Sequence, residues 1–209
     1  MKDELSDTQL LELHGSGNTD AFEALVRRHQ GPLLRHAFGL LGPGNQGEDV
    51  VQEAFMKLAQ RPPSLPNEVL GDARAERAAL GSWLHKVTRN LCMDLLRSEG
   101  RRKRREREVA PGEAAAGGLA DVELNDTREA VGRSLERLPQ EQREVLVLRL
   151  LGDKSYKEIA SITGKKIGTV GWLVSVGLKA LASELEPLLG SAPQGVHRAP
   201  GFTPIQGEL

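Results

Sequence analysis

The side chains that most often catalyse reactions or bind metals are present in this sequence but scattered along it. The histidines are His14, His29, His36, His85 and His197. Cys92, the single cysteine, falls on the apolar side of a helical pattern as a small core residue, and one thiol with such dispersed histidines lacks the spacing of a zinc site. The glycine groups at residues 15–17 and 42–44 lack the strand-to-helix context of a phosphate loop and are expected to be turns. The sequence therefore predicts no enzyme, no metal site and no cofactor.

Basic residues are concentrated in one short stretch, although the chain as a whole is nearly neutral. The formal net charge is −1, from 28 Lys and Arg against 29 Asp and Glu. The basic stretch contains Arg97, Arg101, Arg102, Lys103, Arg104, Arg105 and Arg107, and acidic residues dominate the segment that follows. Such segregation indicates a local anionic partner, because guanidinium and ammonium groups neutralise phosphates. The alternative is an ordinary solvated helix end.

The composition is typical of a soluble helical protein. Hydrophobic residues make up 39% of the chain, charged residues 27% and aromatic residues only 3%, while Ala, Leu, Glu and Arg are abundant. This bias favours helices over sheets. No apolar run approaches the ~18–20 residues that span a bilayer, and the charged start lacks the apolar segment of a signal peptide. Since one cysteine suits a reducing compartment, we expect a cytoplasmic protein.

Three segments interrupt the helical periodicity and divide the chain. Residues 61–67 contain prolines that cannot continue a helix, and residues 109–118 are rich in Gly and Ala, as in a flexible linker. The segment from Gly190 has few core-forming residues and is expected to be a disordered tail. We therefore expect an all-α protein with helical domains at residues 5–107 and 125–189, a linker at 108–124 and a tail at 190–209.

Capping signals and prolines predict the helices of the first domain. Asp20 and Glu23 have the spacing of a capping box, which predicts a helix start. Gly31-Pro32 predicts a break in that helix. An amphipathic helix is expected at about residues 46–60, and a last long helix should begin near Ser82 and run into the basic stretch.

The second domain has the sequence outline of a helix-turn-helix. Pro139 is expected to bend an amphipathic helix pair. Ser155 and Glu158 then form a capping box, and Gly164 can supply the turn before a further helix that opens at Ile167. In a helix-turn-helix this second helix lies in the major groove of duplex DNA.

Several segments together resemble the extracytoplasmic-function (ECF) group of sigma factors, within the sigma-70 family of bacterial RNA polymerase sigma factors. The resemblance lies in residues 20–28, 48–55 and 83–97, which are similar to region 2, and in residues 138–146 and 156–170, which are similar to region 4. These segments follow the family's order and roughly its spacing. The resemblance implies two helical modules that bind core RNA polymerase and promoter DNA, with an anti-sigma factor as a further partner.

The resemblance also implies roles for three groups of residues. Asp49, Gln52 and Glu53 would dock on the clamp helices of polymerase, although a polar stripe is also typical of a solvated helix face. The minus-ten element, whose melted strand presents unpaired bases, would meet Lys86, Arg89, Asn90, Arg97, Arg101, Arg102, Lys103 and Arg104. The family places a base pocket in the loop before Ser82, which is longer than typical here. The minus-thirty-five element would meet Lys165, Lys166, Thr169 and Lys179.

The helix that should read the minus-thirty-five element departs from the family. Members commonly carry basic residues after Gly-Thr-Val, whereas this chain continues with Gly-Trp-Leu-Val-Ser-Val-Gly-Leu at residues 171–178. Without Arg, Asn or Gln on this helix, base readout should be weak or shape-based. Trp172, Leu173 and Val176 are expected to enlarge the domain's own core. The alternative is an exposed apolar patch for an anti-sigma factor or for polymerase.

Two other functions stay open from the sequence. One is a stand-alone helix-turn-helix regulator that binds duplex DNA without polymerase, which would need a self-sufficient recognition helix and usually a dimer interface. The other is a sigma-derived protein-interaction module that no longer reads promoters.

Overall fold

The computed structural model describes residues 5–42, 46–109 and 127–189, and every regular element within these residues is helical. The elements are α1 (Asp7–Gly15), α2 (Thr19–Leu41), α3 (Gln46–Gln60), the 3-10 turn η2 (Asn67–Val69), α4 (Ala73–Val109), α5 (Thr127–Arg137), α6 (Gln140–Leu146), the π-helical turn η3 (Val147–Leu151), α7 (Tyr156–Thr163) and α8 (Ile167–Leu189). The predicted all-α fold is confirmed. The predicted tail and most of the predicted linker lie outside the described residues.

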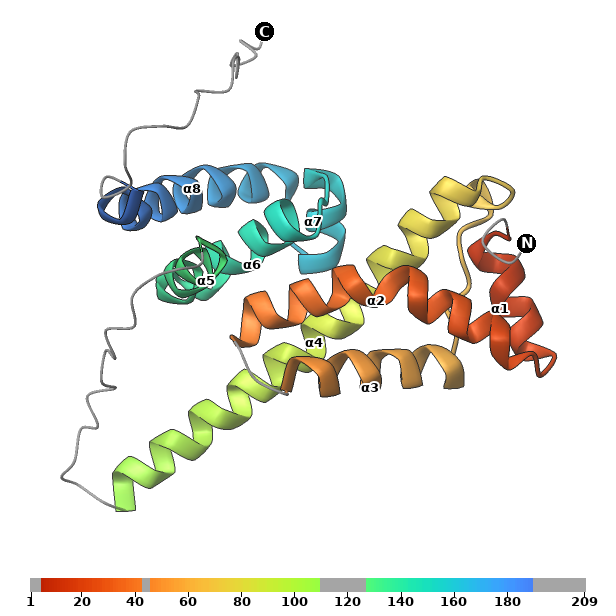
Figure 1. The fold of residues 1–209 in the computed structure, drawn as a ribbon, viewed down its shortest axis with the longest axis horizontal. Coiled ribbons are helices and arrows are strands. Elements are labelled where there is room, and N and C mark those ends of the chain that lie inside the picture. Colours follow the sequence, from red (N-terminus) through yellow and green to blue (C-terminus); the bar gives the residue numbers. More distant parts are fainter. Residues whose placement is uncertain (1–4, 43–45, 110–126, 190–209) are drawn as a thin grey trace, which may run out of the picture.

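Helices α1 to α4 form the first of two bundles, with α2 in contact with the other three helices (Figure 1). Apolar side chains at helical spacing on each element meet in one core, which removes their surface from water and supplies the main stabilisation of the bundle. The core side chains include Leu10, Leu25, Leu33, Leu40, Phe55, Leu58, Leu80, Leu84 and Cys92. The prediction that Cys92 is a core residue is confirmed, and burial raises the pKa of its thiol to about 12.

Helix α1 was not predicted individually, and a buried polar cluster ties it to α2. Ser6 and Gln9 form a capping box at its start. The fully buried carboxylate of Asp7 accepts a hydrogen bond from the Arg28 guanidinium and lies 2.7 Å from Nε2 of His29. Burial by itself would raise the pKa of Asp7, but the hydrogen bonds and charges of His29 and Arg28 outweigh it and lower that pKa.

The start of α2 lies slightly upstream of the predicted position. Asn18, not Asp20, is the N-cap, because the side-chain oxygen of Asn18 accepts a hydrogen bond from the backbone N–H of Ala21 at 3.2 Å. Asp20 lies instead in the first turn, where its negative charge interacts favourably with the positive end of the helix dipole.

The predicted break at Gly31-Pro32 is wrong, since α2 is one helix with Pro32 inside it. A proline within a helix costs about 3 kcal/mol. The buried side of α2 nevertheless continues across the proline, from Leu25 through His29 to Leu33, in steps of four residues. Packing of this shared face against α3 and α4 therefore outweighs the local penalty.

The long helix α4 begins at Ala73 rather than near Ser82. The carboxylate of Asp72 caps it, accepting hydrogen bonds from the backbone N–H groups of Arg74 at 2.9 Å and Ala75 at 3.1 Å. The connection from α3 to α4 is therefore residues 61–72, which include η2, and the second half of the long loop predicted before Ser82 is helical. The first turns of α4 lack a strong apolar stripe, so periodicity did not reveal them.

Helices α5 to α8 form the second bundle, with a core of its own. Pro139 separates α5 from α6, as predicted. The predicted capping box of Ser155 and Glu158 opens α7, and Gly164 ends it in the left-handed conformation at φ 72°. Helices α7 and α8 are thus joined by a tight turn, in the helix-turn-helix arrangement that the sequence predicts. The core side chains include Leu135, Leu138, Val145, Leu146, Leu148, Ile159, Ile162, Val170, Leu173 and Val174.

The two bundles lie side by side and are packed together (Figure 1). Helix α2 contacts α5, α6 and η3, and α4 contacts α7. One close approach is at Gly39 of α2, where an added Cβ would lie 2.6 Å from both Cγ atoms of Val147. Because only a residue without a side chain fits there, Gly39 lets α2 and η3 approach closely. This packing was not predicted from the sequence.

Candidate nucleic-acid and polymerase interfaces

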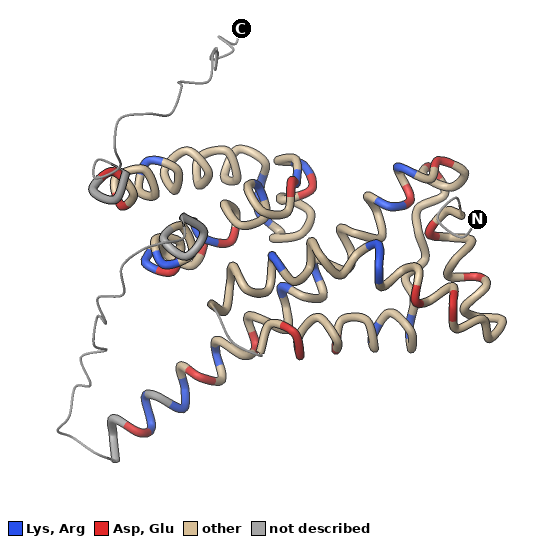
Figure 2. Tube along the Cα trace, in the orientation of Figure 1, with Lys and Arg blue, Asp and Glu red and all other residues tan. Residues whose placement is uncertain are grey.

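The second half of α4 carries a polar and basic stripe, which the buried Met93 and the acidic Asp94 interrupt between Asn90 and Arg97. At about 100° per residue, one side of this helix brings together five exposed side chains within an arc of about 60°. They are Lys86, Asn90, Arg97, Arg101 and Arg104. Figure 2 shows basic residues along the free end of α4, which projects beyond both bundles. We call these five residues the α4 stripe.

The ion pairs along the α4 stripe are weak. Arg97 pairs with Asp94 at 3.3 Å, and both side chains are about 70% exposed. Arg102, which lies on another side of the helix, pairs with Glu106 at 3.7 Å, also in the open. Exposed pairs of this kind contribute about 0–1 kcal/mol, so a phosphate can replace the carboxylate at little cost. The side chain of Lys103, another predicted contact, lies outside those described.

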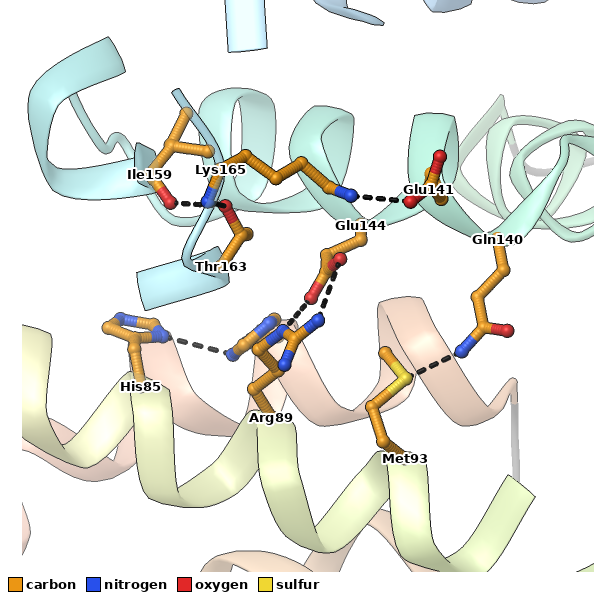
Figure 3. A network of polar contacts seen from close by, with 10 residues as sticks. His85, Arg89, Met93, Gln140, Glu141, Glu144, Ile159, Thr163 and Lys165 are labelled. Carbon is orange, nitrogen blue, oxygen red and sulfur yellow. Dashed lines mark hydrogen bonds and ion pairs between the residues drawn. The ribbon is translucent and has the colours of Figure 1, made fainter. Parts of the chain in front are cut away.

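Arg89 differs from the other predicted minus-ten residues because the second bundle engages it. Its guanidinium forms an ion pair with the carboxylate of Glu144 from α6, through Nε and through a longer contact of 3.4 Å between Nη2 and Oε2 (Figure 3). The Arg89 side chain is 23% exposed and that of Glu144 only 3%. Arg89 is therefore occupied in this arrangement of the two bundles.

The exposed side of α3 is polar and lies opposite its buried side. Asp49 and Gln52 are exposed, and Glu53 is half-buried and pairs with Lys57 at 3.0 Å. Met56, which sequence reasoning did not single out, lies on the same side and is 48% exposed. The structure thus brings the three predicted docking residues together and adds one apolar side chain to them. Methionine is enriched in protein interfaces, so its position fits a docking surface.

The four predicted minus-thirty-five residues are separated by the structure. Lys165 is bound to Glu141 of α6 within the second bundle, and its side chain is 17% exposed (Figure 3). Lys166 and Thr169 are exposed at the start of α8, and Lys179 is exposed further along the helix. Trp172 lies between them on the same side and is 61% exposed. The exposed side of α8 therefore presents the aromatic ring of Trp172 where members of the family commonly carry basic side chains.

The prediction for the three apolar residues of α8 holds only in part. Leu173 is buried in the core at 3% exposure, as expected, whereas Val176 is half-buried and lies outside that core. Trp172 is exposed, so the prediction that it enlarges the core is wrong. Residues 170, 173, 174, 177 and 181 form the buried side of α8, and position 172 falls on the opposite side of the helix.

Two histidines are buried together where the bundles meet. Nδ1 of His36 and Nδ1 of His85 lie 3.1 Å apart, and both residues are almost fully buried. Burial, followed by the charges of Arg89 and Lys154, lowers the pKa of His36 to about 3. Burial, followed by electrostatic interactions with His36 and Lys154, lowers the pKa of His85 to about 2. At neutral pH both rings are therefore uncharged, with one Nδ1 as hydrogen-bond donor and the other as acceptor.

The contacts between bundles include residues that sequence reasoning missed. Besides Glu144, the second bundle supplies the carbonyl of Leu151, which accepts a hydrogen bond from Nε of Arg35 at 2.8 Å. Gln140 donates from its amide to the sulfur of Met93 (Figure 3). The sequence did contain one sign of the role of Glu144. It is an acidic residue next to Val145 and Leu146, which are both core residues, and a carboxylate in such a position needs a counter-charge.

Comparisons with known proteins match both bundles. Residues 25–102 match the family described as Sigma-70 region 2, and residues 128–181 match Sigma-70, region 4. The RNA polymerase sigma-H factor of Pseudomonas aeruginosa is 30% identical over 199 residues, which cover 89% of this chain and 97% of that protein. The ECF RNA polymerase sigma-E factor of Escherichia coli is 29% identical over 200 residues, which cover 90% and 99%.

Solved structures share the fold. The sigma factor RpoE of Bartonella quintana, crystallised with the anti-sigma factor NepR, matches with a TM-score of 0.60 and 26% identity over 81% of this chain and 98% of that one. CnrH, in complex with the cytosolic domain of CnrY, matches with a TM-score of 0.58 and 22% identity over 87% and 97%, which supports the fold alone.

The chain belongs to the sigma-70 family of transcription initiation factors, in its ECF group. It is a sigma factor that directs promoter-specific initiation, and neither a stand-alone regulator nor an interaction module is favoured, because the likeness to sigma factors includes both regions and nearly the whole chain. In the part of the chain that the structure describes, no three His, Cys, Asp or Glu side chains are placed to hold a metal ion. Nor does any helix among these residues have the length and apolarity to cross a membrane.

Proposed function

We propose that this sigma factor binds core RNA polymerase through the exposed side of α3 and promoter DNA through α4 and α8. Asp49, Gln52 and Glu53 are the polar contacts to polymerase, with Met56 as an apolar contact at their centre. Lys166, Thr169 and Lys179 contact the minus-thirty-five element, and Trp172 contributes apolar surface rather than a base-specific hydrogen bond.

The observation that carries the proposal is the α4 stripe. It follows one side of a helix whose end projects into solvent, so the basic end of the stripe is exposed to a nucleic-acid backbone even while the bundles are paired. Arg97, Arg101 and Arg104 neutralise phosphates, and Lys86 and Asn90, nearer the bundle, meet the melted bases. With Arg89 added at its edge, the stripe accounts for minus-ten binding.

The protein acts in the cytoplasm, where core polymerase and promoters are, and catalyses no reaction of its own. An anti-sigma factor is a further partner, in line with the solved complex of the Bartonella quintana relative. The anti-sigma factor binds this chain across the paired bundles. An inhibitor that holds the two bundles together prevents them from contacting the minus-ten and minus-thirty-five elements at the same time.

Reconstitution with core polymerase tests the proposal. Run-off transcripts that require this chain are the expected result. Duplex DNA binding that core polymerase does not affect would instead indicate a stand-alone regulator. Binding to core polymerase without transcripts from any promoter of a library would indicate an interaction module.

The substitution Asp49→Arg tests the docking side of α3. Asp49 is exposed and distant from the core, so the variant should fold normally while losing at least tenfold in affinity for core polymerase, since charge reversal in an interface turns attraction into repulsion. Glu12→Arg, a matched reversal at an exposed position on α1, serves as the control and should bind core as the wild type does. Full affinity in a folded Asp49→Arg variant would remove α3 from the docking surface.

A further inference from the structure

Glu144 is a buried carboxylate whose charge is balanced from the other bundle. It lies on α6 among core residues, and the ion pair with Arg89 of α4 crosses between the bundles (Figure 3). A buried carboxylate without a counter-charge is strongly disfavoured. Separation of the bundles therefore leaves Glu144 without Arg89, and it also frees the Arg89 guanidinium.

The same guanidinium adjoins the surface that we propose for DNA. Arg89 lies at the edge of the α4 stripe, one helical turn from Lys86 and next to Asn90. A carboxylate and a phosphate bind a guanidinium in the same forked geometry. Glu144 thus occupies on Arg89 the place that a phosphate group of promoter DNA would take.

Other contacts hold the carboxylate in that place. Gly39 and Val147 bring α2 and η3 into close contact, and Arg35 donates to the carbonyl of Leu151. Lys154 of the second bundle lies close to Gly81 of α4, so that an added Cβ there would be 3.7 Å from its Nζ. The contacts that pair the bundles therefore also hold Glu144 against Arg89, so the two features occur together in this structure.

We propose that Glu144 is an internal competitor for promoter DNA, which keeps Arg89 masked while the two bundles are paired and releases it when they separate. The inference rests on the proposed function, because it requires that Arg89 contacts DNA. Free sigma factor then binds DNA weakly, and whatever separates the bundles increases its affinity.

The substitution Glu144→Gln in the full chain tests this mechanism. It removes the charge that holds Arg89 but keeps the shape of the side chain. We expect affinity for a fluorescently labelled single-stranded oligodeoxynucleotide of mixed sequence to rise about five- to tenfold at low salt, and the radius of gyration in solution scattering to increase. Adding Arg89→Ala to Glu144→Gln should abolish the gain in affinity and keep the expanded state.

Glu141→Gln is the matched control, since Glu141 lies on the same helix and pairs with Lys165 inside the second bundle. It makes the same change in net charge and should alter DNA affinity less than twofold. An equal gain in both variants would overturn the proposal, because net charge alone would explain it. A gain that survives Arg89→Ala would also overturn it, while leaving the α4 stripe intact.

A second variant opens the interface without a change of charge. Gly39→Ala places a methyl group against Val147 and should also expand the protein and increase DNA affinity, whereas Gly31→Ala on the same helix meets only Arg35 at 3.6 Å and should do neither. An expanded Gly39→Ala variant with wild-type DNA affinity would overturn the inference. Failure of the proposed function is a different result, because wild-type chain with core polymerase would then give no transcripts.

Discussion

The His36 and His85 pair depends on pH because both rings must stay neutral in the folded protein. Their pKa values of about 3 and 2 lie well below the ordinary value of 6.5, chiefly because burial removes the charged form from water. Arg89, Lys154 and Arg35 add positive charge around them. In the unfolded chain both histidines protonate as the pH falls through about 6.5, so the unfolded state then binds more protons than the folded state.

Stability should therefore fall between pH 7 and pH 5. The folded state has its full advantage above pH 6.5 and loses about 2 kcal/mol per histidine by pH 5. His85→Gln keeps a hydrogen-bonding side chain beside His36 but cannot titrate, so the loss over this range should be about half as large. Urea unfolding at the two pH values measures it. An unchanged loss in the variant would mean that His85 is not the group that resists protonation.

Truncation on the two sides of α8 should differ in its cost to stability, which is a property of the element rather than of one residue. Leu173 fills the core, so Leu173→Ala should cost about 2–4 kcal/mol in the free energy of unfolding. Trp172 is larger but exposed, so Trp172→Ala should cost less than about 1 kcal/mol. Chemical denaturation of the two variants checks this order. A reversed order would place Trp172 in the core, as the sequence suggested.

The sequence predicted elements well wherever local chemistry decided them. Capping by Ser155, the bend at Pro139 and the turn at Gly164 depend on residues a few positions apart, so the pattern alone was sufficient. Helix α2 continues through Pro32 because side chains from α3 and α4 pack on it, and that contribution is not local. Periodicity did not predict the start of α4 at Ala73, because an alanine-rich turn has helical propensity but no apolar stripe.

At the scale of the whole molecule, the candidate site could be predicted only in part. The exposed sides of α3 and α4 follow from periodicity, so Asp49 and Arg97 lie on solvent-facing surfaces as the motifs implied. The masking of Arg89 by Glu144 joins residues far apart in the sequence, across an interface that no periodicity encodes. In the paired arrangement Glu144 is bound to Arg89, so the way the two bundles pack determines whether the Arg89 guanidinium is available.

A disulfide across the interface would fix the paired state and test whether separation is needed for function. An added Cβ at Gly39 would lie 3.2 Å from the Cβ of Val147, somewhat below the mean of about 3.8 Å for disulfides, so Gly39→Cys with Val147→Cys needs only a small shift to form the bond. The oxidised double variant should lose nearly all promoter-dependent run-off transcription with core polymerase, and a reductant should restore it. Both single variants, with Cys92 buried, should be insensitive to oxidant. Full transcription by the oxidised, crosslinked protein would mean that the paired bundles are already competent for initiation.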